Sequence, residues 1–306
     1  MTRKFIHSLP ALLCILSLAL AARVRADELE QKTKEQKFLR FVEDAEGGGK
    51  LETAIINYRN DAGVAVHLVG AVHVGEEQYF KGLAKTFEGY DALLYEMVKP
   101  KDAGVPGAGY QSQSMVSMFQ RFLKDALQLE FQLDAIDYSA KNFIHADLDA
   151  ETFARMQAER GESLMVLMLR LFLSEMQNPR QNVPEISLPE LIVALTSPDG
   201  HRHFKLILAR QFEDLERQVA GLEGPGGSVI LTERNKKAMD VLKETIASGK
   251  KDIGIFYGAA HLIDLDKRLR DMGFKATKTE WRTAWDMTPK DGDVIIKVYK
   301  KKPVEN

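Results

Sequence analysis

Two stretches of the sequence share one pattern: an apolar run, then Gly-Ala-x-His, then a helical pattern. The first copy is LVGAVHVGEEQ at residues 68–78, and the second is the similar IFYGAAHLIDL at residues 255–265. A buried strand that leads directly into a helix is the repeating unit of α/β folds, and glycine lets the backbone turn sharply without a Cβ clash. The repeat therefore predicts two strands of one sheet, each followed by a histidine.

The sequence around both copies extends the α/β pattern. Residues 51–70 read as two strands around a turn signal, and residues 75–98 read as a helix followed by a buried strand. Strand, helix and strand at this spacing predict a parallel crossover unit. We expect an α/β fold with a central, mostly parallel sheet made of two related α/β halves, with a helical insertion at about residues 113–222 between them. Beyond the insertion, the pattern predicts a helix, a strand, a second helix and two closing strands, at residues 229–249, 252–261, 262–274, 275–287 and 293–301.

The first 26 residues have the layout of a signal peptide. Two cations precede an apolar run, and the residues before Ala26 suit cleavage after it. A membrane anchor and a lipoprotein are the alternatives, but the run is short for a span, and small residues are lacking just before Cys14. We expect an exported protein, periplasmic or secreted, without a stable membrane span after cleavage. A charged leader is expected at residues 27–49 and one folded domain at residues 50–302.

The composition excludes several kinds of chemistry. Cys14 is the only cysteine and lies inside the expected signal peptide, so thiol catalysis, thiolate metal sites and disulfides are excluded for the mature chain. The formal net charge is −2, and the basic residues are scattered rather than gathered with aromatic side chains. This distribution argues against nucleic acid as a partner.

Three side chains with metal-binding chemistry follow the predicted buried strands. His73 and His261 end the two Gly-Ala-x-His turns, and Glu96 ends the apolar run DALLY. The carboxyl ends of strands in an open α/β sheet form the edge where ligands bind. Two imidazoles and a carboxylate can bind a divalent metal such as Mn, Co, Zn or Fe, which activates water or polarises a carbonyl. The alternative is that each histidine is a hydrogen-bonded loop residue.

A further candidate group, Glu233-Arg234-Asn235, begins the helix before the second Gly-Ala-x-His strand. Arg234 can hold a substrate carboxylate or a developing oxyanion, and we count Glu233 with it as a catalytic candidate. The alternative is a helix cap and a surface ion pair. The remaining candidates are a core histidine (His67), an exposed His-x-His loop (His201 and His203), and residues that line the cleft or form a structural turn (Asp137, Tyr138 and His145).

With these motifs, the chain resembles the TraB/PrgY/GumN family, which groups with the Tiki proteins. The resemblance spans about residues 64–274 and rests on Gly70-Ala71-Val72-His73, Glu96, Glu233-Arg234-Asn235 and Gly258-Ala259-Ala260-His261. It implies an α/β fold of two related halves around a helical insertion, related to the erythromycin esterase and ChaN-type haem-binding proteins. Tiki members are described as metal-dependent proteases of secreted peptides. Their proposed site implies His73, His261 and Glu96 as metal ligands here, with Arg234 in the site.

The resulting hypothesis is a metal-dependent, peptidase-like hydrolase of exported peptides or other small substrates. In it, Glu96 is either a metal ligand or the general base, because the two roles differ only in where one carboxylate oxygen points. The alternative is a non-catalytic protein that binds a peptide or haem on the same fold, with the two histidines on the haem iron.

Overall fold

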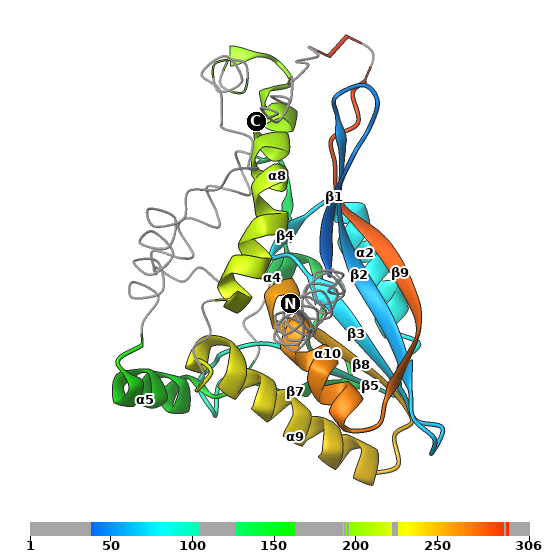
Figure 1. Ribbon diagram of the computed structural model, residues 1–306, viewed down its shortest axis with the longest axis vertical. Helices are drawn as coiled ribbons and strands as arrows, with labels where there is room; N and C mark the ends of the chain where they lie inside the picture. The colour runs from blue at the N-terminus through cyan, green and yellow to red at the C-terminus, as the bar shows by residue number, and fades with distance from the viewer. Residues whose placement is uncertain are drawn as a thin grey trace, which may run out of the picture. The chain divides into compact units, whose positions relative to one another are not determined.

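The computed structural model describes residues 38–104, 127–162, 192, 194, 196–221, 226–290 and 292–293. The described elements all belong to one compact unit that begins at Phe38 (Figure 1). The strands are β1 (Leu39–Glu43), β2 (Gly49–Arg59), β3 (Ala65–Ala71), β4 (Val74–Gly75), β5 (Ala92–Tyr95), β6 (Glu130–Phe131), β7 (Phe143–His145), β8 (Asp252–Gly258) and β9 (Lys275–Asp286). The helices are α2 (Glu77–Phe87), α4 (Gln132–Ala135), α5 (Ala150–Arg160), α8 (Gly200–Gly221), the π-helical η1 (Val229–Glu233), α9 (Arg234–Ala247), the 3₁₀ turn η2 (Ala259–His261) and α10 (Leu262–Asp271).

The described strands form a seven-stranded mixed sheet and a small two-stranded sheet. In the large sheet, β3, β8, β5 and β7 follow one another in parallel. The remaining strands are antiparallel: β1 and β3 pair with successive parts of one edge of β2, and β9 pairs with its other edge. The predicted α/β class is confirmed, and the relation between two α/β halves stays a prediction.

The hairpin of β2 and β3 forms where the turn signal predicts it. The side chain of Asn60 accepts a hydrogen bond from the backbone N–H of Val64, and Gly63 takes a positive φ of 78° that favours glycine. Nearly all of β3 is buried, as expected of a strand covered on both faces. The turn therefore fixes the register that delivers β3 to the centre of the sheet.

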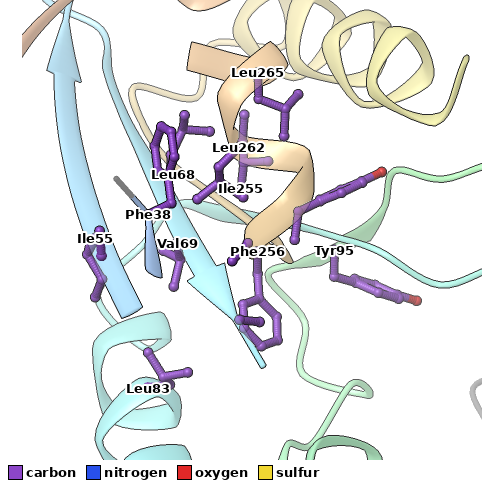
Figure 2. Close-up of a cluster of buried hydrophobic side chains, with 14 of the residues drawn as sticks. Phe38, Ile55, Leu68, Val69, Leu83, Tyr95, Ile255, Phe256, Leu262 and Leu265 are labelled. Carbon is purple, nitrogen blue, oxygen red and sulfur yellow. The ribbon is translucent and has the colours of Figure 1, made fainter. Parts of the chain in front are cut away.

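Helices cover both faces of the sheet around β3 (Figure 1). Figure 2 shows the core: Leu83 of α2 lies near Ile55 and Val69, while Leu262 of α10 lies near Leu68. These side chains are almost fully buried. Successive residues of a strand point to opposite faces, so one apolar strand supplies both layers of the core.

The expected leader at residues 27–49 is wrong for residues 38–49, while residues 27–37 lie outside the described residues. Phe38 is buried in the core, and β1 pairs with β2 over its whole length. The amide of Ala54 also donates to the carbonyl of Phe38 at 2.9 Å. Residues 38–49 are therefore part of the sheet. Their charged residues suggested a leader because β1 is an edge strand whose burial decreases from Leu39 to Glu43.

The middle of the chain combines helices with strands of the sheets. The described helices α5 and α8 lie within the expected helical insertion, but β7 from the same range pairs with β5 in the main sheet. The apolar stretch at residues 164–173 and most of the last predicted strand, at residues 293–301, lie outside the described residues. None of the described helices is long and apolar enough to cross a membrane.

Candidate functional site at the carboxyl edge of the parallel strands

The candidate site lies where four parallel strands end. His73 follows β3, His261 follows β8 within η2, Glu96 follows β5, and Asp147 follows β7. The strand order β3–β8–β5–β7 brings these ends side by side. The sequence predicted that His73, Glu96 and His261 share this edge; Asp147 is an additional residue.

Arg234 connects three of the four strand ends. Its Nε donates to Asp147 Oδ1 at 2.9 Å, and its Nη2 donates to Asp147 Oδ2 and to Glu96 Oε1, each at 2.6 Å. Its Nη1 makes the two longest contacts, 3.3 Å to His261 Nε2 and 3.4 Å to the carbonyl of Ile230. Nη1 is therefore the part of the guanidinium held least firmly.

The charged side chains of this network are largely buried, so their interactions are only weakly screened by water. The side chain of Asp147 is 0% exposed, that of Arg234 is 11% exposed and that of Glu96 is 13% exposed. Burial alone would lower the pKa of Arg234. The carboxylates of Glu96 and Asp147 outweigh this effect, so the pKa of Arg234 lies above its ordinary value. Burial raises the pKa of Glu96, but Arg234 and the neighbouring histidines hold it well below the ordinary value. Both groups are charged at neutral pH.

The backbone before Arg234 forms an unusual helix start. The π-helical turn η1 leads directly into α9, and its capping group is Ser228, whose hydroxyl accepts from the amide of Leu231. Thr232 is buried inside this turn. Single π-turns are frequent at functional sites. Here the turn precedes the residue that delivers its guanidinium to the strand ends.

His261 is held by a buried amide. Asn235 Oδ1 lies 2.7 Å from His261 Nδ1, and Asn235 Nδ2 donates to the carbonyl of His261 at 3.1 Å and to Asp264 at 2.9 Å. Arg234 donates toward Nε2, so these partners assign the proton to Nδ1 and leave a lone pair on Nε2. That nitrogen lies 3.5 Å from Glu96 Oε1.

The glycines of the two turns serve close packing. Neither Gly70 nor Gly258 has a positive φ. A Cβ on Gly258 would lie 3.3 Å from Glu96 Oε2, which accepts the amide N–H of Gly258 at 2.6 Å. A Cβ on Gly70 would lie 3.3 Å from Leu262, the residue after His261. The expectation that both glycines are needed for a sharp turn is therefore corrected, because each allows a neighbouring group to approach the backbone.

His73 supplies an accessible imidazole beside this cluster. Its side chain is exposed to solvent, and its carbonyl accepts from the amide of Gln132, which joins its turn to the β4–β6 sheet. Although the residue is exposed, the protein packed around its ring removes hydration and lowers the pKa of His73; the charge of Glu96 raises this pKa, and the charges of Arg234 and His261 lower it. His73 is therefore neutral at physiological pH.

Glu233 has partners on another side of its helix turn. It accepts from Arg160 at 2.7 Å and from Lys236 at 2.9 Å. Burial raises the pKa of Glu233, but these two cations lower it more. Glu233 therefore forms the surface ion pair that was the alternative to a catalytic role. Arg234, in contrast, lies in the ion-pair network with Glu96 and Asp147.

The remaining candidates have structural contacts. His67 bonds Asn57 and Asp252 and stacks on Tyr90, as a histidine of the sheet. Asp137 accepts from Ser139 in a tight turn, the hydroxyl of Tyr138 accepts from Gln132, and His145 lies 2.6 Å from the carbonyl of Met97. The expectation that His201 and His203 lie in an exposed loop is wrong. Both residues belong to α8, and His203 is buried against Asp199.

The metal proposed from the sequence does not fit the site in this arrangement. The donor types are suitable, but Arg234 contacts both Glu96 Oε1 and His261 Nε2, the two atoms that a metal would need. Within the described ranges, no group of three or more His, Cys, Asp or Glu side chains is arranged to hold a metal ion.

Comparison with known proteins identifies no relative. No model of a protein family matches the chain, and neither the curated proteins nor the solved structures contain a match. The resemblance to the TraB/PrgY/GumN family stays a prediction that rests on the motifs.

Proposed function

We propose that the protein is a hydrolase of peptides or other small carbonyl substrates, acting at the carboxyl edge of β3, β8, β5 and β7. The convergence of Glu96, Arg234 and His261 beside the exposed, neutral His73 carries this proposal. A buried cation next to an accessible base supplies oxyanion stabilisation and general-base catalysis, two of the contributions that accelerate carbonyl hydrolysis. Export of the protein, and therefore an exported substrate, is part of the same proposal.

In this proposal, His73 is the general base. Its imidazole accepts a proton from water as the water oxygen attacks the carbonyl carbon. The oxyanion that forms receives a hydrogen bond from Arg234 Nη1, which exchanges its long contacts to His261 and Ile230 for the substrate. When the tetrahedral intermediate collapses, the C–N or C–O bond breaks, and the leaving group takes the proton from His73.

Glu96 has an electrostatic role in this scheme. Its depressed pKa makes it a weak base, so it stays ionised and fixes Arg234 through Oε1 while the amide of Gly258 holds Oε2. The divalent metal that the resemblance implies, with His73, His261 and Glu96 as its ligands, is a separate proposal. Elemental analysis of protein purified without chelators tests it, with His73→Ala and His261→Ala beside the native chain.

Hydrolysis is tested with a panel of peptides and small esters, assayed with and without added Mn, Co, Zn or Fe. We expect turnover by the native protein and a loss of at least 100-fold in kcat/KM for His73→Ala, the effect typical of removing a general base. His201→Ala is the control, because this half-buried histidine belongs to α8. Turnover that survives in His73→Ala, or a Soret band on haem addition without any hydrolysis, would contradict the proposal.

A further inference from the structure

A polar cleft is formed by residues outside the strand-end cluster, from the first turns of α8, the start of α2 and the end of β9. Its volume is about 760 Å³, within the range of small-molecule sites. Its acidic lining residues are Glu76, Asp199, Asp286 and Asp293. Its basic lining residues are Arg202, Lys205 and Lys290. A cleft of this size with charged walls suits a small, charged ligand.

Lys205 presents unused hydrogen-bond donors to this cleft. Its side chain is 6% exposed, and its Nζ donates to Glu76 Oε1 at 2.6 Å. Among the described residues, that oxygen is the only hydrogen-bond acceptor of Nζ. An ammonium group carries three N–H donors, so Lys205 can bind a further anionic oxygen.

Glu76 offers the opposite charge next to Lys205. Its side chain is 33% exposed, and its second oxygen, Oε2, accepts no hydrogen bond within the described part of the chain. A cationic N–H group of a ligand can therefore bind there. Because the charges of Lys205 and Glu76 are in contact, a ligand that binds both needs its own two charges close together. The α-ammonium and α-carboxylate of a free amino acid meet this condition, because a single carbon joins them.

A third group in the cleft, the carboxylate of Asp286, favours a further positive charge on the ligand. Its side chain is 48% exposed, and its ion pair with Lys50 is long, at 3.5 Å, and open to solvent, so it is weak. The cleft has four carboxylates against three cations from lysine and arginine, a formal surplus of negative charge. A basic side chain on the ligand balances this surplus.

The backbone at Gln128, which lines the same cleft, is strained. Its φ is 52°, and within the described ranges every other residue with a positive φ is glycine. This conformation is uncommon for residues with a Cβ, and strained residues cluster at ligand-binding and active sites. The strain at Gln128 is therefore an observation, independent of the charges, that supports a binding role for the cleft.

From these observations, we propose that the cleft binds a free α-amino acid with a basic side chain, such as L-arginine or L-lysine. The α-carboxylate accepts from Lys205, the α-ammonium donates to Glu76 Oε2, and the basic side chain extends to Asp286. Binding balances the surplus negative charge while Lys205 and Glu76 stay paired. The inference does not depend on the proposed hydrolysis, because the cleft shares no residue with the strand-end cluster.

Calorimetric titration of the full chain with L-arginine tests this inference. We expect binding, and binding weaker by about tenfold for each of three analogues that lack one charged group. Nα-acetyl-L-arginine lacks the α-ammonium, L-argininamide lacks the α-carboxylate, and L-alanine lacks the basic side chain. The first two analogues also represent arginine at the C-terminus and at the N-terminus of a peptide, so they separate a free amino acid from a peptide end. No binding of L-arginine, or equal affinity for any analogue, would overturn the inference.

Substitutions locate the ligand in the cleft. Glu76→Gln should weaken L-arginine binding by about tenfold. Glu77→Gln, which changes the exposed neighbouring residue, is the control and should leave the affinity unchanged. Asp286→Asn should bind L-arginine and L-alanine with similar affinity, because it removes the partner of the basic side chain.

A double variant guards against misfolding. Glu76→Gln leaves the buried ammonium of Lys205 without its carboxylate, so Glu76→Gln/Lys205→Gln removes both charges together and should also bind L-arginine more weakly. Circular dichroism confirms that each variant is folded. Unchanged affinity for L-arginine in the folded Glu76 variants, or a preference for L-arginine over L-alanine that persists in Asp286→Asn, would overturn the inference.

Discussion

At the scale of single residues, the buried amide of Asn235 matters as much as the charged groups around it. Its side chain contacts both His261 Nδ1 and the His261 carbonyl, and it also donates to Asp264. The tautomer of His261, and hence the lone pair on Nε2, depends on this amide because Nδ1 must donate to an acceptor. A charged side chain at position 235 could not both accept from His261 Nδ1 and donate to the His261 carbonyl, as this neutral amide does.

We therefore expect Asn235→Ala to lower the free energy of unfolding by about 1 to 3 kcal/mol, because buried partners lose their hydrogen bonds. Urea unfolding followed by circular dichroism measures this loss, and ¹⁵N NMR of the imidazole should show that the Nδ1–H tautomer of His261 is no longer dominant. Lys243→Ala on the exposed face of α9 is the control, and it should change stability by less than about 0.5 kcal/mol. An unchanged tautomer in Asn235→Ala would show that Asn235 does not set it.

At the scale of elements, the first turn of α8 depends on an ionised carboxylate. Burial raises the pKa of Asp199, but hydrogen bonds from Arg202 and Ser197 and the charge of His203 lower it more, to about 2. A carboxyl with a depressed pKa stabilises the fold fully above its ordinary value of 3.8, and it loses this contribution as the pH falls from there to about 2.

Asp199→Asn should therefore lower the free energy of unfolding by about 1 to 2 kcal/mol at pH 7, allowing for screening of a charge near the surface. The difference from the native protein should shrink between about pH 4 and pH 2. Urea unfolding over this pH range measures it, with Asp240→Asn, an exposed carboxylate of α9, as the control. A difference that stays constant down to pH 2 would contradict the depressed pKa.

The first strand gives a second prediction at this scale. Phe38, directly before β1, is 1% exposed and joins the core of Figure 2, whereas Val42 of β1 is 43% exposed. Phe38→Ala should cost about 3 to 5 kcal/mol in unfolding free energy, and Val42→Ala should cost less than about 0.5 kcal/mol. Thermal and urea unfolding compare the two. Similar small losses in both variants would contradict the conclusion that residues 38–49 are part of the sheet.

At the scale of the whole molecule, the sequence predicted which residues share the edge but not how they contact one another. Apolar runs were enough to predict β3, β5 and β8, because such patterns are local. That β8 lies between β3 and β5 depends on tertiary packing, which no local pattern contains. The place of β1 in the sheet was missed for the same reason, because its short sequence LRFVE carries no clear strand pattern of its own.

The partners of Arg234 illustrate this limit. Asp147 lies 87 residues before it, in a segment marked only by a run of polar and aromatic residues. Glu233 was a candidate because it is next to Arg234, yet its contacts are to Arg160 and Lys236. Neighbours along a helix start point in different directions, so sequence proximity could not separate them.

The antiparallel strands also support the site, through β9. The indole N–H of Trp285 donates to the carbonyl of Val74 at 2.8 Å, and the amide of Glu76 donates to the carbonyl of Ala284. Both bonds fix the backbone directly after His73. Trp285 is fully buried and packs against Phe212 of α8. The outer strand thus holds the turn that carries the proposed base.

Trp285→Phe should therefore loosen this turn while the sheet persists. We expect a loss of about 2 to 4 kcal/mol in unfolding free energy, from the cavity and from a buried carbonyl without its donor. Amide hydrogen exchange at residues 73–76 should become faster in this variant. Trp281→Phe is the matched control on the same strand, because Trp281 is half-buried beneath the guanidinium of Arg40 and does not contact the turn through a hydrogen bond in the described structure. If both variants changed exchange at residues 73–76 equally, β9 would support the fold in general and not the His73 turn in particular.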